Sequence, residues 1–207
     1  MVKLSHLDPR GRARMVDVGR KPVTARRAVA SALVILNRST LEHLWSGNLE
    51  KGDALAVARL AGIQGAKQTA NLVPLCHPLP LDHIAVEMKV LPEQSAIHIF
   101  TEARTRAATG VEMEALTAAA VAALALIDMV KGLDRDARIA EVRLELKEGG
   151  SSGRWTRDGH EDPWREDVSK PHAPKNQKRP VTAKREDPNT RGGRHNGSRR
   201  PHKKLRP

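Results

Sequence analysis

The sequence of 207 residues predicts an α+β sandwich, with helices on one face of a mostly antiparallel sheet, followed by a disordered tail. Several short segments alternate apolar and polar residues, as strands with one buried face do, and two longer segments have helical spacing. Charge is uneven: residues 1–150 carry a net +3 and residues 151–207 a net +9 of the total +12. We therefore expect a folded domain over residues 1–153 and a basic, Pro-rich tail over 154–207, which has too few apolar side chains to fold.

Two strands and a short helix are expected near the N-terminus. Residues 14–18 alternate in part, and residues 24–36 are rich in Val, Ile and Ala, as strands commonly are. Ser39 and Glu42 are spaced as a capping box, in which each side chain satisfies a free amide of the first helical turn. The short helix that they predict would end at Gly47.

A second helix is predicted over residues 53–71 by small apolar residues at helical spacing. Its Ala and Gly residues would allow a neighbouring helix or sheet to approach closely. Pro74, Pro78 and Pro80 then exclude regular structure, because proline lacks an amide hydrogen and fixes its own φ angle. Residues 72–81 should therefore form a rigid connector.

Three further strands follow from alternation. Residues 84–90 and 96–103 alternate apolar and polar side chains on either side of a turn at 92–95, which is typical of a hairpin. Residues 139–146 alternate in the same way. These segments complete the predicted sheet.

The longest predicted helix runs from Thr109 to Lys131. It begins with a second capping-box pattern, Thr109-x-x-Glu112, and continues through helix-forming Ala and Leu. Gly132 follows the last helical residue, where glycine commonly ends a helix.

Several classes of protein are excluded. The longest uncharged apolar run, residues 115–127, is too short to cross a membrane, and the first six residues lack the apolar core of a signal peptide. Cys76, the only cysteine, can form neither an internal disulfide nor a Cys-rich zinc site. We expect a soluble, cytoplasmic protein without a membrane span.

Asp128 and Lys131 form the first candidate site. They are three residues apart, so they share a helix face and can hold each other charged. They continue a stripe whose apolar middle predicts burial and which comprises Glu114, Thr117, Val121 and Leu124. A half-buried acid–amine pair is a common unit of proton transfer, and an ordinary ion pair at a helix end is the structural alternative. Spacing alone leaves both interpretations open.

The acidic residues at the start of the same helix form the second candidate site. Glu112 has a structural explanation in the capping box, whereas Glu114 has none of that kind. Glu114 and Asp128 are 14 residues apart in the sequence, which is about 21 Å along a helix. One helix cannot bring both into one small-molecule pocket. If both act, they serve different pockets or a second subunit completes the site, and we expect the second arrangement in a homo-oligomer.

The predicted connector supplies the third candidate site. Cys76 and His77 are neighbours, so in an extended chain they point to opposite sides, which argues against a nucleophilic Cys–His pair. We interpret Cys76 as a small buried apolar residue. His77 is held between prolines and is suited to ligand contact or acid–base catalysis. It has no metal-ligating partner at a usual spacing, which argues against zinc.

Two lysines flank the second predicted helix. Lys51 precedes its start at Asp53, where free amides and the helix dipole favour an anion, and Lys67 lies near its other end. Residues 149–153 form a Gly/Ser loop that would suit either phosphate contact or a linker. No phosphate-binding or dinucleotide-binding glycine motif is present. These residues suggest an enzyme that acts on an anionic substrate.

Six motifs in order resemble the cyclic pyranopterin monophosphate synthases, the protein C family of molybdenum cofactor biosynthesis. The resemblance covers residues from about 4 to 153. The motifs are Met15-Val16-Asp17-Val18, Lys51-Gly52-Asp53, Ala61-Gly62-Ile63-Gln64, Leu75-Cys76-His77-Pro78-Leu79, Thr109-Gly110-Val111-Glu112-Met113-Glu114-Ala115-Leu116-Thr117-Ala118 and Asp128-Met129-x-Lys131.

The resemblance implies a specific reaction. Such enzymes convert (8S)-3′,8-cyclo-7,8-dihydroguanosine 5′-triphosphate, made from GTP by a radical S-adenosylmethionine enzyme, to cyclic pyranopterin monophosphate and pyrophosphate. It also implies a ferredoxin-like fold and a hexamer of three dimers with pockets at subunit interfaces. No organic cofactor is implied, and Mg²⁺ accompanying the triphosphate is compatible with the reaction.

The resemblance also assigns roles by motif position. Asp128 and Lys131 correspond to the central acid–base pair, and Lys51 to a general acid. The remaining positions would bind substrate: Lys67, Leu75, Cys76, His77, Glu112, Met113 and Glu114.

The chain departs from the family in a few places. Where the family often has Lys-Ser-Gly-Gly-Lys-Ser-Gly, this chain has Lys147-Glu148-Gly149-Gly150-Ser151-Ser152-Gly153. The second lysine is missing and Glu148 would repel phosphate, which argues against a phosphate-binding role for this loop. Gly19, Ile127 and Val130 replace a usual Ser, Tyr and Cys, and we expect these changes to affect packing only.

Two other classes of function compete with the synthase. The basic tail would bind polyanions such as RNA non-specifically through its charge, or it would be a solvated extension without a partner. Residues 1–153 offer only Trp45 and Phe100 as aromatic residues, too few for base stacking. A structural oligomer without catalysis would not need the acids, lysines and histidine of the candidate sites.

Overall fold

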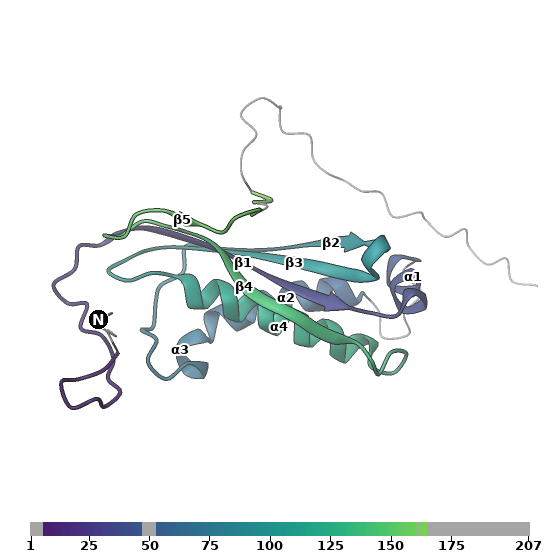
Figure 1. Ribbon diagram of the computed structural model, residues 1–207, viewed down its shortest axis with the longest axis horizontal. Coiled ribbons are helices and arrows are strands. Elements are labelled where there is room, and N and C mark those ends of the chain that lie inside the picture. The colour runs from purple at the N-terminus through teal and green to yellow at the C-terminus, as the bar shows by residue number, and fades with distance from the viewer. Residues whose placement is uncertain (1–5, 47–52, 161, 165–207) are drawn as a thin grey trace, which may run out of the picture. The chain divides into compact units, whose positions relative to one another are not determined.

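The chain folds as a five-stranded antiparallel sheet with its two longest helices on one face (Figure 1). The computed structural model describes residues 6–46, 53–160 and 162–164. Its elements are β1 (Thr24–Ile35), α1 (Arg38–Ser46), α2 (Ala54–Lys67), α3 (Thr69–Leu72), β2 (His83–Leu91), the 3₁₀ turn η1 (Pro92–Gln94), β3 (Ala96–Ala107), α4 (Glu112–Val130), β4 (Arg138–Glu148) and β5 (Trp155–Thr156).

The strand order is β2-β3-β1-β4-β5. The first four strands, with α2 between β1 and β2 and α4 between β3 and β4, have the ferredoxin-like arrangement. The α+β fold with helices on one face and the hairpin of β2 and β3 are thus confirmed. Strand β1 lies in the centre of the sheet, between β3 and β4. Its residues Ala28 to Ala32 are buried, because the two neighbouring strands cover its edges and both of its faces are shielded from solvent.

Close packing of α2 on α4 depends on two glycines. A Cβ atom at Gly62 would lie 3.0 Å from the Ala118 carbonyl oxygen, and one at Gly65 would lie 2.8 Å from the Val121 Cβ. The predicted close approach of this small-residue helix is therefore confirmed, although the helix ends at Lys67 and α3 follows as a separate turn. The Thr101 hydroxyl donates a 2.7 Å hydrogen bond to the Ala115 carbonyl oxygen and ties α4 to the sheet.

Helix α4 is long and apolar enough to cross a membrane, with a mean hydropathy of 1.8. Its buried residues are mostly alanines, and they face α2 and the sheet. This is the pattern of a core helix, in which small side chains permit close contact on two sides.

Three local predictions were wrong. Residues 14–18 form no strand; within residues 6–23, the only bridge joins Leu7 and Ala13. Helix α1 begins at Arg38 rather than after Ser39, so that Ser39 lies inside it and its carbonyl oxygen is 2.6 Å from the His43 Nδ1. The predicted end of this helix at Gly47 lies outside the described residues.

The third error concerns the capping box of α4. Val111 is the N-cap residue and makes no side-chain cap hydrogen bond, and Glu112 is the first helical residue. Thr109 and Glu112 therefore do not occupy the positions that a capping box requires.

The sheet continues beyond residue 153. Strand β5 pairs with β4 through Thr156 and Trp155, and Asp162 contacts β1, so residues beyond the predicted boundary at 153 are attached to the sheet. Strand β5 is only two residues long and lies in a charged segment, so the sequence shows no alternation of apolar and polar residues that would predict it. The predicted tail from residue 165 onwards lies outside the described residues.

Candidate functional site

The predicted site residues lie at both ends of α4. Glu112, Met113 and Glu114 form its first turn, Asp128 belongs to its last turn, and Lys131 is its C-cap. The helix is continuous between them, so the 14-residue separation corresponds to about 21 Å. The predicted site residues on α4 therefore fall into two groups, one at each end of the helix, and these groups are too far apart to line one small-molecule pocket within a single chain.

Burial controls the protonation of Glu114. This residue is only 4% exposed. Loss of solvent raises the pKa of its carboxyl to about 7, and the nearby negative charge of Glu112 adds to the increase. Near neutral pH the carboxyl is therefore divided between its two protonation states, which suits a group that donates or accepts a proton.

The connector lies against this end of α4. Leu75, Cys76 and His77 are all partly exposed. Burial, followed by the negative charge of Glu114, raises the pKa of the Cys76 thiol, so the thiol stays protonated at neutral pH and is a poor nucleophile. The Thr105 hydroxyl donates a short hydrogen bond to the Pro80 carbonyl oxygen and holds the end of the connector on β3.

His77 is the acid–base candidate of the connector. Within the described residues the ring makes no hydrogen bond or ion pair, so both ring nitrogens are available for contact with a ligand. Its placement beside Cys76 brings it to the end of α4 that carries Glu114.

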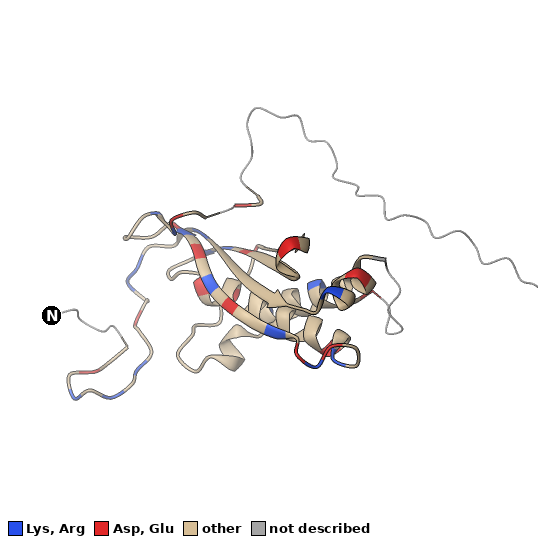
Figure 2. Cartoon of the chain, turned by 45° about the vertical axis from the view of Figure 1, so that its right-hand side comes forward, with Lys and Arg blue, Asp and Glu red and all other residues tan. Residues whose placement is uncertain are grey.

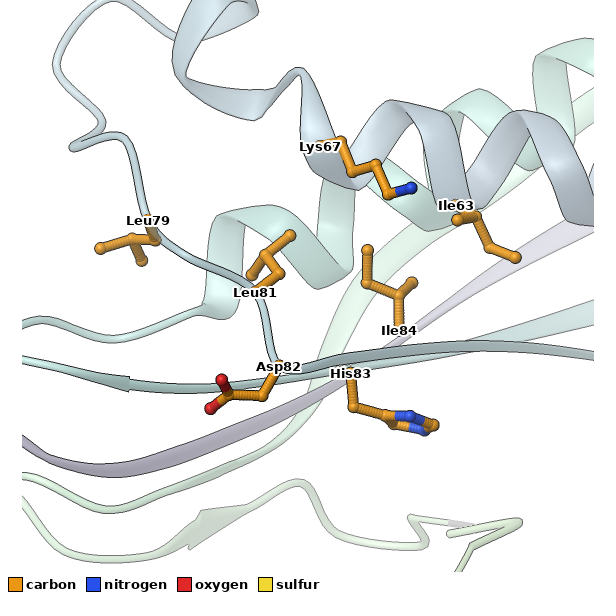
Figure 3. Close-up of a pocket in the computed structure, with 7 residues that line it drawn as sticks. All are labelled: Ile63, Lys67, Leu79, Leu81, Asp82, His83 and Ile84. Atoms are coloured by element: carbon orange, nitrogen blue, oxygen red, sulfur yellow. The ribbon is translucent and has the colours of Figure 1, made fainter.

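Lys67 lies beside a pocket of about 400 Å³ between α2 and the start of β2. Figure 3 shows its amine above Ile84, whereas Asp82 and His83 point to the opposite side of the strand. The pocket lining is Ile63, Lys67, Leu79, Leu81, Asp82, His83 and Ile84. Among the described residues that line this pocket, Lys67 is the only charged residue apart from Asp82 and His83, and the other lining residues are apolar. Its position in the last turn of α2 is also favourable for the helix dipole.

Lys147 is a site residue that the sequence-based list lacked. Its Nζ lies 3.4 Å from the Glu112 Oε1. The Glu112 carboxylate folds back over Gly110, where a Cβ atom would lie 1.8 Å from Oε2, and this orientation aims it at β4. One sequence feature could have indicated Lys147, because it is the first lysine of the Lys-x-Gly-Gly segment.

Arg26 is the second residue that the list lacked. Its Nε and Nη2 donate to the carbonyl oxygens of Ala107 and Ala108 at 3.3 and 3.4 Å. A Cβ atom at Gly150 would lie 1.6 Å from its Nη1, so the Gly149–Gly150 turn lies directly on the guanidinium. Arg26 carries no motif in the sequence, and only the sheet register places it here.

Glu148 does not oppose these cations in the way that its sequence neighbours suggest. Strand alternation places it on the other sheet face from Lys147, where it pairs with Arg27 at 3.4 Å and Arg154 at 3.3 Å. The argument that Glu148 would repel phosphate from this loop is therefore weakened.

Asp128 and Lys131 form an ion pair of 2.5 Å at the other end of α4. Each side chain is 61% exposed, so the expectation of a half-buried pair was wrong for the single chain. The reason is that the buried face of α4 passes through Ala118, Ala122 and Leu126, whereas the stripe that ends in this pair rotates into solvent at Leu124.

Lys51 lies outside the described residues, although Asp53 after it caps α2 by accepting a 3.1 Å hydrogen bond from the Ala56 amide. Within the described residues, no group of three His, Cys, Asp or Glu side chains could hold a metal ion.

These features define a class. The molecule is a ferredoxin-like α+β protein whose candidate site combines a carboxyl of raised pKa, a histidine and several cations, as expected for acid–base chemistry on an anionic small molecule. A family model described as the MoaC family matches residues 15–150. The chain belongs to the MoaC family.

Curated relatives agree with this assignment. The chain is 55% identical over 150 residues to the cyclic pyranopterin monophosphate synthase of Nostoc sp., with 72% of this chain and 89% of the relative covered. The proteins of the same name from Cereibacter sphaeroides and Thermomicrobium roseum are 52% and 51% identical. These two matches cover 75% and 78% of this chain, and 98% and 97% of the relatives.

Proposed function

We propose that this chain is a cyclic pyranopterin monophosphate synthase of molybdenum cofactor biosynthesis. It converts (8S)-3′,8-cyclo-7,8-dihydroguanosine 5′-triphosphate to cyclic pyranopterin monophosphate and releases pyrophosphate. The observation that carries the proposal is the buried Glu114, with a pKa of about 7, beside the Cys76–His77 connector, in a chain that over its matched residues is more than half identical to synthases of that name.

The chemistry needs proton transfer and stabilisation of phosphate charge. Glu114 can donate or accept a proton near neutral pH, His77 is the proposed second acid–base group, and Asp128 with Lys131 is the proposed central acid–base pair. Lys67, Lys147 and Arg26 would hold the triphosphate and the leaving pyrophosphate.

The remaining proposed roles follow the motif positions. Lys51 would act as a general acid. Leu75, Cys76, Glu112 and Met113 would contact the substrate. No organic cofactor takes part in this proposal, and Mg²⁺ would enter only with the triphosphate.

The proposed enzyme is a cytoplasmic homohexamer, a trimer of dimers, in which two subunits complete each site. The distance along α4 between Glu114 and Asp128 supports sharing, because one chain cannot place both on one substrate. The exposed apolar residues Leu60 and Leu124, 68% and 59% exposed on the paired helices, support a subunit contact on this layer.

Turnover by the purified full-length chain tests the proposed reaction. The cyclised GTP substrate should give one pyrophosphate for each pterin product, measured by a coupled phosphate assay and by chromatography. Folded wild-type protein that gives neither product would contradict the synthase assignment.

Mixing inactive variants tests the shared site. Glu114→Ala and Asp128→Ala subunits should each be inactive. Subunit exchange should restore about a quarter of wild-type activity, because about half of all dimers are then mixed and each mixed dimer carries one intact site out of two. Mixed protein that exchanges subunits and stays inactive would contradict a site shared in this way.

A further inference from the structure

The chain that follows the family match forms a C-terminal strap, defined here as the described residues of 155–164. Its first two residues form β5 at the edge of the sheet beside β4, and His160 and Asp162 after it contact the sheet face opposite α2 and α4 (Figure 1). The Arg157 amide donates to the Glu145 carbonyl oxygen and its Nε to the Leu144 carbonyl oxygen, both at 2.9 Å. His160 is buried, with its Nδ1 3.8 Å from the Glu145 Oε2. The strap is therefore attached along β4.

Asp162 attaches the strap to β1 through a buried ion pair. Arg27 Nη2 donates to both oxygens of Asp162, at 2.8 and 2.7 Å, and the Asp162 side chain is only 5% exposed. The same guanidinium donates to Glu102 on β3 at 2.5 Å and to Glu148 on β4 at 3.4 Å. One arginine thus joins three strands and the strap.

Arg26, the residue before Arg27, belongs to the candidate site. Strand alternation directs Arg26 to the helix-side face, where the Gly149–Gly150 turn covers it. On β4, Lys147 lies on that same face beside Glu112, and Glu148 next to it is one of the partners of Arg27. The segment from Gly149 onwards therefore contacts the start of β1 on both sheet faces: Gly150 packs on Arg26 on one face, and Asp162 pairs with Arg27 on the other.

We propose that Asp162 is a positioning residue, which through Arg27 fixes the ends of β1 and β4 so that Arg26 and Lys147 face the substrate's phosphate groups. A buried ion pair contributes more to orientation than to net stability, because desolvation offsets most of its Coulomb energy. Binding groups held by such pairs are placed accurately, and small misplacements reduce binding or rate strongly. The inference rests on the proposed function for the identity of the substrate.

Asp162→Asn tests the proposal, with Asp158→Asn as the matched control. Asp158 is an exposed acid of the same strap that makes no ion pair or hydrogen bond with a described residue. We expect Asp162→Asn to raise KM for the cyclised GTP substrate about tenfold while kcat stays within about threefold, and Asp162→Glu to restore part of the loss. Asp158→Asn should match the wild type. An unchanged KM, or a loss of kcat alone that follows the folded fraction, would overturn the proposal.

A second measurement separates this proposal from the assigned reaction. Inorganic pyrophosphate is titrated into the full-length protein by calorimetry, which requires no turnover. Weaker binding to Asp162→Asn by about tenfold, but not to Asp158→Asn, supports the positioning role even if the wild type lacks synthase activity. Equal binding to all three proteins overturns it. If Asp162→Asn does not fold, Arg27→Lys, which keeps the charge but loses the planar fork, replaces it under the same criteria.

Discussion

The proton chemistry at the start of α4 depends on the burial of one carboxyl. An exposed glutamate at the first helical turn would be ionised at neutral pH, and the helix dipole would favour that charge. Glu114 is instead buried beside the connector, and its pKa rises to about 7. The same environment keeps the Cys76 thiol protonated. Residue type alone predicts neither state.

The raised pKa of Glu114 should appear in the pH dependence of stability. Between its ordinary pKa of 4.5 and the folded value of about 7, the folded state binds more protons than the unfolded state, so stability falls as pH rises. Glu114→Gln removes this slope. From about pH 4.5 to about pH 8, the variant should gain about 3 kcal/mol in unfolding free energy relative to wild type. Urea denaturation across this range measures the gain, and a constant difference would contradict a buried, titrating Glu114.

The Asp128–Lys131 pair should matter for activity and not for folding. Both side chains are exposed in the single chain, so Asp128→Ala or Lys131→Ala should change unfolding free energy by less than about 1 kcal/mol. Loss of a proton-transfer group should lower kcat at least about a hundredfold. The exposed i,i+4 pair of Arg38 and Glu42 supplies the control, because Glu42→Ala should change neither quantity. Normal turnover in either α4 variant would exclude the assigned roles.

At the scale of elements, the α2–α4 contact positions both ends of the site. Lys67 ends α2, and Glu114 and Asp128 lie at the two ends of α4. Small side chains allow the two helices to approach closely, so that they form one layer on the sheet. Figure 2 shows that this layer carries few charges, whereas acids and bases alternate along β4.

Gly65→Ala tests the helix contact. The added methyl group would lie 2.8 Å from the Val121 Cβ, so the helices must separate, and the expected loss in unfolding free energy is about 1–3 kcal/mol. Gly132→Ala is the matched control, because a Cβ atom there meets nothing within 4 Å. Chemical denaturation of both variants measures the difference. Equal stabilities would show that the contact is looser than the structure indicates.

At the scale of the whole molecule, the strap decides where the chain can be shortened. Truncation after residue 164 keeps β5 and the Asp162–Arg27 pair, whereas truncation after residue 153 removes both. The longer product should retain wild-type kcat and KM, and the shorter one should bind substrate more weakly. Parallel kinetics of the two purified products and the full chain measure this. A fully active 1–153 protein would support the predicted boundary at residue 153 and argue against a role for the strap.

Alternation and helical spacing predicted the main elements, because a strand repeats every two residues and a helix about every 3.6 residues, and both repeats can be read directly from the sequence. The hairpin, α4 and β4 follow such periods, and they appear where expected. The capping boxes at Ser39 and Thr109 failed because their spacing recurs without the required backbone geometry. The segment 14–18 failed because partial alternation over five residues does not provide a pairing partner, and the described residues give it none.

The sequence alone determined the fold class, the family resemblance and most candidate residues, because periodic burial and ordered motifs are properties of the chain itself. The structure alone decided that Glu114 is buried and Asp128 exposed, although both lie on one predicted stripe. It also brought Lys147 to Glu112, Arg26 to Gly150 and Asp162 to Arg27 across long sequence separations. Such contacts join residues from strands and segments far apart in the sequence, and a local pattern shows which face of one strand is buried but not which distant side chain lies opposite it.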